Sequence, residues 1–524
     1  MGGAGSSASG IGVSNRDTQA ALAYYAATKH APGVGSPPYD YRANPRDRPL
    51  PYKIYSQLEP LPLPRDFAPT IGSALDAIRG TASPVESTTS GHIDLTTLGR
   101  LCLYSNGITR WLRRMSGPRA FRAAGTTGAL YHVELYLVCG DLPDLAAGIY
   151  HYGAHDHALR KLCDGDLRGV LVEATAHEEA ISQAQLIVVC TSTFWRNAWR
   201  YRARAYRHSF WDGGTVLANL LALAAGAGIG ARVVVGFQDP VVNALIDVDP
   251  DHEAAIALVA LGVTDRTPTP THQPTAATHH ATEPLSRREV HFPTISTIQA
   301  ASSLFTLDEV SDWRQTQAAA MPRLLSNPLS AQDPPIQAIE SVIRRRGSTR
   351  RFGNVPIGSA QLSSLLETGV LPIPLDVGDA IPLEQYLIVQ AVDGLDSGAY
   401  IFNATDRSLN LLRPGSFRTR ARYLSLSTRS RSAQRSFVVR LSLTPSQPLW
   451  LRPPRAPVPS VSPGLPPGRR GRPPHQTLDA QGRMPLPWRV CSGPGTSPMY
   501  SAAHQYPDRA LSIGVSYDSK PRSH

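Results

Sequence analysis

Two stretches of the chain, 250 residues apart, decide the fold. Residues 133–162 read VELYLVCGDLPDLAAGIYHYGAHDHALRKL, and residues 383–412 read LEQYLIVQAVDGLDSGAYIFNATDRSLNLL. Aligned without a gap, they share the pairs Glu134/Glu384, Tyr136/Tyr386, Leu137/Leu387, Gly148/Gly398, Tyr150/Tyr400, Asp156/Asp406, Leu159/Leu409 and Leu162/Leu412. Chance is a poor explanation for eight identities in one register, so the sequence predicts an internal repeat. The alternative is two unrelated strand–turn–strand units.

Both repeats have the pattern of a β-hairpin with one buried face. An apolar run is followed by a Gly-marked turn, an aromatic alternation, an Asp-marked turn and a second apolar pair. After the first repeat, 186–190 (LIVVC) predicts a buried strand, 211–227 a long apolar helix ended by a Gly-Ile-Gly turn, and 233–236 another strand. Strands mixed with such a central helix indicate a layered α+β fold.

The length of 524 residues suits more than one domain. The predicted division is a disordered N-terminus at 1–20, an N-terminal segment at 21–79, a first α+β domain at 80–263, a Thr/Pro/His-rich linker at 264–300, a second and partial copy at 335–444, and a Pro/Arg-rich disordered tail at 445–524. The tail is either native or the product of a shifted reading frame, and the second copy is incomplete in both cases.

Charge and cysteine usage exclude several classes of function. The net charge is +11, but residues 413–524 hold 18 Arg or Lys against 3 Asp, so the basic character belongs to the tail. We therefore expect no nucleic-acid partner. The five cysteines include no CxxC pair, which argues against a disulfide scaffold or a zinc site and for a reducing, cytoplasmic location. No stretch predicts a membrane span or a secretory signal.

A basic run ahead of the second repeat is the first motif that carries chemistry. In Arg346-Gly347-Ser348-Thr349-Arg350, two arginines flank a hydroxyl at alternating positions, and such donors can converge on one phosphate. Alone the match is weak, because basic runs are usually solvated. Its position between two predicted helices, 335–343 and 357–366, favours a binding role.

A loop of small residues ahead of the first repeat is the second motif. It reads Gly125-Thr126-Thr127-Gly128-Ala129-Leu130-Tyr131-His132. Small side chains allow a flat ligand to approach the backbone, and threonines supply hydrogen bonds. The bland alternative is a plain loop leading into a strand. In the second copy the same place holds Asp376-Val377-Gly378-Asp379, which lacks hydroxyls and adds negative charge.

Together these motifs resemble the nitroreductase superfamily, and within it the SagB/ThcOx-type dehydrogenases, which are flavin oxidases of peptide azolines. The resemblance also includes the D-G-G…N-L-L-A-L-A-A-G-A-G-I-G-A-R run and the segment Pro51-Tyr52-Lys53-Ile54-Tyr55. It covers residues 20–262 and 335–412. It implies tandem FMN-dependent domains that form a pseudo-dimer within one chain, leaving a homodimer open.

The resemblance also implies a cofactor site. Arg346, Ser348 and Arg350 of the second copy would hold the FMN phosphate, facing Thr126, Thr127, Gly128 and Leu130 of the first copy. Azoline oxidases carry a Lys-Tyr pair before the long helix, and here the pair is Arg200-Tyr201. An arginine cannot act as a general base, although it could lower the pKa of Tyr201. The alternative is that Tyr201 is a surface aromatic on a basic helix with Arg196, Arg200, Arg202 and Arg204.

The expected function is FMN-dependent dehydrogenation of thiazoline or oxazoline rings of a ribosomal peptide to azoles. The expected partners are that peptide, or a small-molecule substrate, and cyclodehydratase components. One alternative is an NAD(P)H-dependent nitroreductase-like flavoenzyme, and another is an inactive partner subunit of a peptide-modifying complex. The family's G-G-F-x-D strand is present only once, as Val235-Gly236-Phe237-Gln238-Asp239, so we expect the predicted site to lack one wall.

Overall fold

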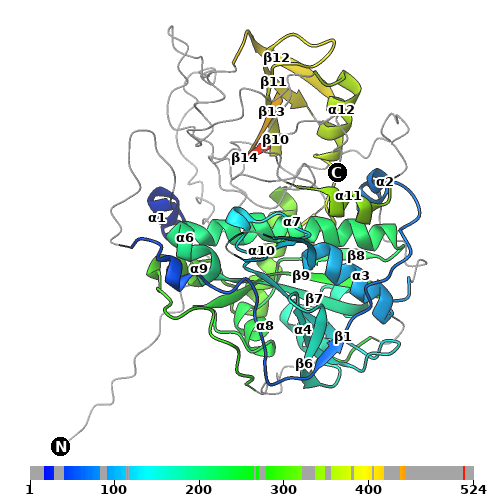
Figure 1. Ribbon diagram of the computed structural model, residues 1–524, viewed down its shortest axis with the longest axis vertical. Helices are drawn as coiled ribbons and strands as arrows, with labels where there is room; N and C mark the ends of the chain where they lie inside the picture. Colours follow the sequence, from blue (N-terminus) through cyan, green and yellow to red (C-terminus); the bar gives the residue numbers. More distant parts are fainter. Residues whose placement is uncertain are drawn as a thin grey trace, which may run out of the picture.

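The computed structural model describes residues 17–28, 41–82, 91–113, 115, 117–264, 267–270, 279–320, 337–347, 356–378, 383–403, 406–417, 437–443 and 511–513. Two antiparallel sheets and one long helix organise these residues. Figure 1 shows the long helix α7 (Ala205–Gly226) between the larger sheet and the smaller one.

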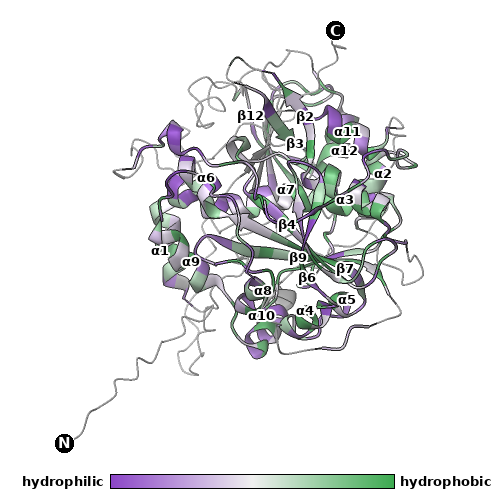
Figure 2. Cartoon of the chain, turned by 60° about the horizontal axis from the view of Figure 1, so that its bottom comes forward, coloured by the Kyte–Doolittle hydropathy of each residue, from purple (hydrophilic) through white to green (hydrophobic). Residues whose placement is uncertain are grey.

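The larger sheet has seven strands in the order β1-β6-β5-β4-β7-β9-β8. Its strands are β1 (Pro60–Pro62), β4 (Val133–Cys139), β5 (Gly148–Gly153), β6 (Ala158–Asp164), β7 (Ala184–Thr193), β8 (Ala231–Val234) and β9 (Glu253–Val263). The central strands are buried on both faces, which is why they read as nearly continuous apolar runs rather than as alternations. In Figure 2 they are coloured as hydrophobic, whereas helix α6 (Phe194–Tyr201) is hydrophilic.

Helices cover both faces of this sheet and produce two hydrophobic cores. One core lies against α7 and the other against α4 and α8. The remaining helices of this part of the chain are α1 (Thr18–Thr28), α2 (Ala74–Gly80), α3 (Leu95–Asn106), α4 (Arg168–Ala174), α5 (Glu179–Ser182), α8 (Asp239–Leu245), α9 (Pro293–Ser302) and α10 (Leu307–Ala320), with 3-10 turns η1 (Pro45–Asp47), η2 (Thr127–Ala129) and η3 (Arg202–Arg204). A separate hairpin joins β2 (Ile108–Leu112) to β3 (Arg119–Arg122).

The smaller sheet has five strands in the order β12-β11-β10-β13-β14. These are β10 (Leu383–Val389), β11 (Gly398–Asn403), β12 (Ser408–Pro414), β13 (Phe437–Leu443) and β14 (Leu511–Ile513), accompanied by α11 (Ile339–Arg345) and α12 (Ser359–Thr368). Strands β10, β11 and β12 begin and end 250 residues after β4, β5 and β6. The pairing agrees as well, because Leu137 faces Tyr150 and Leu387 faces Tyr400.

The two repeats contribute unequally to packing. The second hairpin and α12 bury a small core of their own. In contrast, Ile339 and Ile343 of α11 and Leu375 belong to the core of the larger sheet. Leu375 also extends that sheet through a parallel bridge to Val233. Residues just ahead of the second repeat therefore hold the two parts of the chain together.

Three segments differ from the sequence-based expectation. Helix α1 begins at Thr18, inside the region expected to be disordered, and α9 begins at Pro293, inside the expected linker. These two helices form because Ile295 and Ile298 of α9 are buried in one cluster with Tyr24 of α1. Strand β14 pairs with β13 and lies within the expected disordered tail. Residues 445–510 and 514–524 of that tail lie outside the described residues.

The described residues contain neither a membrane-spanning helix nor a cluster of metal-ligating side chains. Within those ranges, no helix is long and apolar enough to cross a bilayer. Nor do three or more His, Cys, Asp or Glu side chains of that part of the chain gather where they could hold a metal ion. His280, the second of two adjacent histidines, contacts the carbonyl oxygen of Leu162 through Nε2 at 2.9 Å.

Thiol reactivity should follow burial in the folded protein. Burial raises the pKa of the Cys139 and Cys190 thiols to about 12, whereas the side chain of Cys163 is only half-buried. Because the thiolate is the reactive form, iodoacetamide at neutral pH should label Cys163 and leave Cys139 and Cys190 unmodified. Mass spectrometry of the native and the urea-unfolded protein measures this, and labelling of Cys139 before unfolding would contradict it.

Candidate functional site

A strained loop connects β3 to β4. Gly128, Ala129 and Tyr131 have φ angles of 68°, 53° and 51°. Glycine adopts such values freely, but a positive φ at Ala129 and at the bulky Tyr131 costs on the order of 1–3 kcal/mol each. Strain of this size persists only where surrounding contacts hold the backbone.

Several contacts hold this loop from below. Asp212 of α7 accepts hydrogen bonds from the backbone N–H of Thr127 at 2.7 Å and from its hydroxyl at 2.8 Å. The guanidinium of Arg196 donates to the carbonyl oxygen of Tyr131 at 3.2 Å. The Thr127 side chain therefore points into the protein. The hydroxyl of Thr126 accepts from the N–H of Tyr131 at 3.4 Å, and among the described residues its proton has no acceptor.

Tyr201, at the end of α6, packs directly on this loop. A Cβ atom added to Gly128 would lie 2.8 Å from the Tyr201 hydroxyl. Burial raises the pKa of Tyr201, Arg200 lowers it and Asp212 raises it, with a net increase. Arg200 is exposed, with its guanidinium carbon 5.7 Å from the centroid of the Tyr201 ring. Arg200 thus lowers the pKa of Tyr201 as expected, but burial outweighs this effect, and Tyr201 is a protonated hydrogen-bond donor at neutral pH.

Gly128 should tolerate no side chain. Gly128→Ala would combine a positive φ with a clash against Tyr201, so the loop must shift. We expect a loss of about 1–3 kcal/mol in unfolding free energy. The matched control is Gly165→Ala, which also has a positive φ, 91°, but has no neighbouring atom within 4 Å. Equal losses in urea unfolding for the two variants would show that Tyr201 does not press on the loop.

Arg346 reaches the same loop from the far end of the chain. Its Nη2 donates to the carbonyl oxygen of Ala123 at 3.2 Å. Burial lowers the pKa of Arg346, the nearby Tyr131 raises it and Arg110 lowers it. The Nε atom of Arg346 is buried and has no hydrogen-bond partner among the described residues. A buried guanidinium donor without an acceptor, beside a second arginine, is suited to an anionic group.

The sequence-predicted site residues are thus partly assembled. Thr126, Thr127, Gly128 and Leu130 form the loop, Tyr201 contacts it, and Arg346 lies beside it. Leu130 is buried, and its Cδ1 lies 3.4 Å from a Cβ added to Gly128. Ser348 and Arg350 lie outside the described residues. A flavin phosphate fits the donor set at Arg346, and a flat ring fits the small-residue loop.

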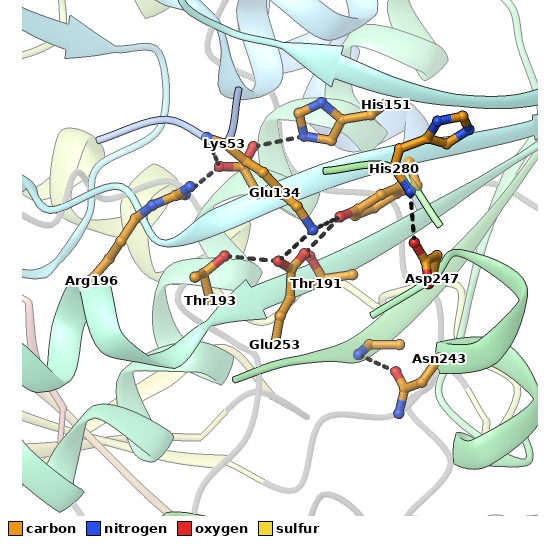
Figure 3. Close-up of polar contacts among 12 residues, drawn as sticks. Lys53, Glu134, His151, Thr191, Thr193, Arg196, Asn243, Asp247, Glu253 and His280 are labelled. Carbon is orange, nitrogen blue, oxygen red and sulfur yellow. Dashed lines mark hydrogen bonds and ion pairs between the residues drawn. The ribbon is translucent and has the colours of Figure 1, made fainter. Parts of the chain in front are cut away.

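Beneath the loop lies a buried ionic network that sequence reasoning did not find (Figure 3). Glu253 of β9 accepts hydrogen bonds from Lys53 at 3.1 Å, Tyr136 at 3.0 Å and Thr191 at 2.6 Å. Lys53 Nζ also donates to the Tyr136 hydroxyl at 2.7 Å. Burial alone would raise the pKa of Glu253, but Lys53 and Thr191 bring it below the usual value. The N-terminal segment is thereby fastened to the sheet.

Glu134 of β4 is the second buried carboxylate of this network. It is 1% exposed and pairs with Arg196 of α6, and Arg122 lies 3.8 Å away. His151 Nε2 is 3.4 Å from its other oxygen. Burial would raise the pKa of Glu134, but Arg196, His151 and Arg122 outweigh it and hold that pKa far below the usual range. One sequence signal existed, because Glu134 is a charged residue inside an otherwise apolar strand.

The loop of the second repeat that corresponds to Thr126–Leu130 has a different arrangement. The carboxylate of Asp376, 250 residues after Thr126, accepts the backbone N–H groups of Val235 at 3.0 Å and Gly236 at 2.9 Å. Arg314 Nε lies 3.3 Å from the same carboxylate. The chain itself therefore satisfies the backbone donors of the Val235–Gly236 segment.

Part of the chain is similar to known proteins. Residues 119–263 match the nitroreductase family model. A protein of Methanocaldococcus jannaschii, provisionally named a nitroreductase, is 22% identical over 159 residues, which are 30% of this chain and 77% of that protein. The trifolitoxin-processing protein TfxB of Rhizobium leguminosarum bv. trifolii is 26% identical over 147 residues, 27% of this chain, and the match spans only 39% of that protein.

A solved structure supports the fold. The crystal structure of a provisionally named nitroreductase from Anabaena variabilis superimposes with a TM-score of 0.60 at 24% identity, covering 81% of this chain and 85% of that chain. The expected nitroreductase-like α+β fold, with its antiparallel sheet, is therefore confirmed.

Proposed function

We propose that this nitroreductase-family domain works with the second repeat as an FMN-dependent oxidoreductase. The observation that carries the proposal is the position of Arg346, whose buried Nε lacks an acceptor among the described residues and whose Nη2 bonds to Ala123, three residues before the Thr126–Leu130 loop. The FMN phosphate would lie at Arg346, with Ser348 and Arg350 completing the clamp. The ring would lie over the Thr126–Leu130 loop.

Bound FMN supplies hydride acceptance at its ring, and the residues of the chain supply binding and orientation. Thr126 would donate its free hydroxyl proton to the ring. Tyr201, with its raised pKa, would hold its proton and orient the substrate by donating a hydrogen bond. The two repeats would form a pseudo-dimer, with one module supplying the anion clamp and the other the loop.

We propose one FMN per chain. In a pseudo-dimer, the second site would lie at the equivalent loop, where the Asp376 carboxylate already accepts the N–H groups of Val235 and Gly236. A carboxylate in that place already takes up these two backbone donors, and its negative charge would repel the anionic cofactor. Flavin released by denaturation, divided by protein concentration, should therefore approach one, and a ratio near two would contradict a single site.

The substrate we propose is a thiazoline or oxazoline ring of a modified peptide, which loses two hydrogens to become an azole. What supports this choice is the name of the Rhizobium relative, a toxin-processing protein, together with the tyrosine at position 201. Cyclodehydratase components would be the natural partners, because they would form the azoline that is oxidised. The replacement of the family's lysine by the exposed Arg200 leaves Tyr201 as the single polar side chain assigned to substrate.

The visible spectrum of the purified protein tests the proposal. A flavin spectrum that bleaches when an azoline-containing peptide is added, with azole formation by mass spectrometry, is the expected result. Bleaching by NAD(P)H but not by the peptide would support a nitroreductase-like reductase instead. A colourless protein that takes up no added FMN would indicate an inactive partner subunit and overturn the proposal.

A further inference from the structure

A series of buried hydrogen bonds leads from the protein interior to the Thr126–Leu130 loop. Asp212 Oδ2 accepts the Thr127 N–H and lies 2.7 Å from Nε2 of His132. Nδ1 of His132 lies 2.9 Å from the hydroxyl of Ser192, which is 2.8 Å from that of Ser209. This series of hydrogen bonds joins α7, the start of β4 and the end of β7, so three elements position the Asp212 carboxylate.

The residue types are those of a hydrolase triad, but their burial rules out that role. Ser192 and His132 are 0% exposed and Asp212 is 3% exposed, so no substrate reaches the serine. The placement of the groups also differs from that in a hydrolase, where the serine faces the substrate. Here the aspartate lies at the loop, and the serine lies in the interior. The tautomer of His132 that carries its proton on Nε2 satisfies the whole series, since Nδ1 then accepts from Ser192.

We propose that Asp212 is a positioning residue for the cofactor, fixing the strained Thr126–Leu130 loop in the conformation that faces the ring, and that His132 orients Asp212 for this task. The inference rests on the proposed function, because it assumes that this loop contacts FMN. It deepens that function by assigning two residues that never touch the cofactor.

The carboxylate is required for a geometric reason. Both donors of Thr127, its N–H and its O–H, point at Asp212, and Nε2–H of His132 is a third. An ionised carboxylate accepts all three, whereas an asparagine amide has one oxygen and presents two N–H donors on its other side. An asparagine at 212 can keep the Thr127 N–H and the His132 Nε2–H on its oxygen only by turning its NH₂ group towards the Thr127 hydroxyl, which must then accept instead of donate. The negative charge that strengthens all three contacts is lost in either orientation, so the loop loses part of what opposes its strain.

The test compares Asp212→Asn with Asp94→Asn as matched control. Asp94 also accepts a backbone N–H at 2.7 Å, that of Thr97, but at the start of α3. Hydrogen–deuterium exchange of the flavin-free proteins should be faster at residues 126–131 in Asp212→Asn alone. FMN titration, followed by flavin fluorescence, should show an affinity about 10- to 100-fold weaker for Asp212→Asn and close to wild type for Asp94→Asn.

The outcomes separate the two proposals. If the wild-type protein does not bind FMN, the proposed function fails and the inference fails with it. If the wild type binds and Asp212→Asn binds equally well, only the positioning role of Asp212 is overturned. Weaker binding with unchanged loop exchange would also overturn it. Should Asp212→Asn fail to fold, Ser192→Ala, which removes only the hydroxyl that holds His132, should show a smaller increase in exchange at the same residues, and no increase would count against the inference.

Discussion

Replacing Glu134 by glutamine should lower the free energy of unfolding by about 3–5 kcal/mol. Glu134 is 1% exposed, and glutamine keeps its shape but removes the charge that balances Arg196 and Arg122. Both guanidinium groups would then be buried without a counter-ion, and neither can lose its proton. Urea unfolding followed by circular dichroism measures the effect.

Three further variants make this prediction specific. Asp164→Asn, which breaks the exposed pair with Lys161, should cost no more than about 1 kcal/mol. Glu253→Gln should cost less than Glu134→Gln, because its cationic partner, Lys53, can deprotonate. A double variant, Glu134→Gln with Arg196→Met, should recover part of the loss. Equal effects of Glu134→Gln and Asp164→Asn would contradict the account of the buried network.

The contribution of Glu134 should also depend on pH. Its pKa in the folded protein lies below the unfolded value, which is roughly 4.3. A group with a depressed folded pKa stabilises the fold above its unfolded pKa, and the stabilisation is lost as the pH falls towards the folded value. The difference in stability between wild type and Glu134→Gln should therefore be constant from pH 7 to about pH 5 and shrink below roughly pH 4. A difference that grows on acidification would contradict the depressed pKa.

Replacing Arg346 by alanine should weaken FMN binding by about 1.5–3 kcal/mol, or roughly 10- to 150-fold. The reason is the loss of a charge-assisted contact to the phosphate from a guanidinium that is largely buried beside the loop. Titration of the flavin-free protein with FMN measures the change. The matched control is Arg345→Ala, because Arg345 is the preceding residue but is exposed and bonds to Gln337.

Arg345→Ala should leave the FMN affinity within about twofold of wild type, since exposed arginines contribute little. Thermal unfolding of both variants separates a binding defect from a folding defect, because Arg346 also bonds to Ala123. Wild-type affinity in Arg346→Ala would show that the phosphate is held elsewhere and would remove the main support for the proposed site.

The main strands and the long helix were predictable from sequence. Residues 186–190 lie within β7, and α7 ends at Gly226, where the Gly-Ile-Gly turn was expected to stop it. The predicted helices at 335–343 and 357–366 correspond to α11 and α12 with shifted boundaries. Local patterns suffice for these elements because apolar spacing and turn residues act over a few positions.

The candidate site was predictable only in part. The loop at 126–130 and Arg346 were identified as motifs, and the structure brings them together. Arg196 was considered part of a basic surface helix with Arg200, yet Arg196 is fully buried and Arg200 is exposed. The four-residue spacing places both on one face of α6, so periodicity could not separate them. Arg196 differs from Arg200 because it forms an ion pair with the buried carboxylate of Glu134.

The sequence by itself determined the strands, the long helix, the hairpin repeated at an offset of 250, and the two motifs on which the proposed flavin site rests. Tertiary structure alone decided which charges are buried and what they hold, namely that Lys53 pairs with Glu253, that Asp212 holds Thr127, and that Asp376 caps Val235 and Gly236. The physical reason is that secondary structure follows from neighbours in the chain. The state of a buried charge instead depends on a partner that can lie 200 residues away, as for Lys53 and Glu253.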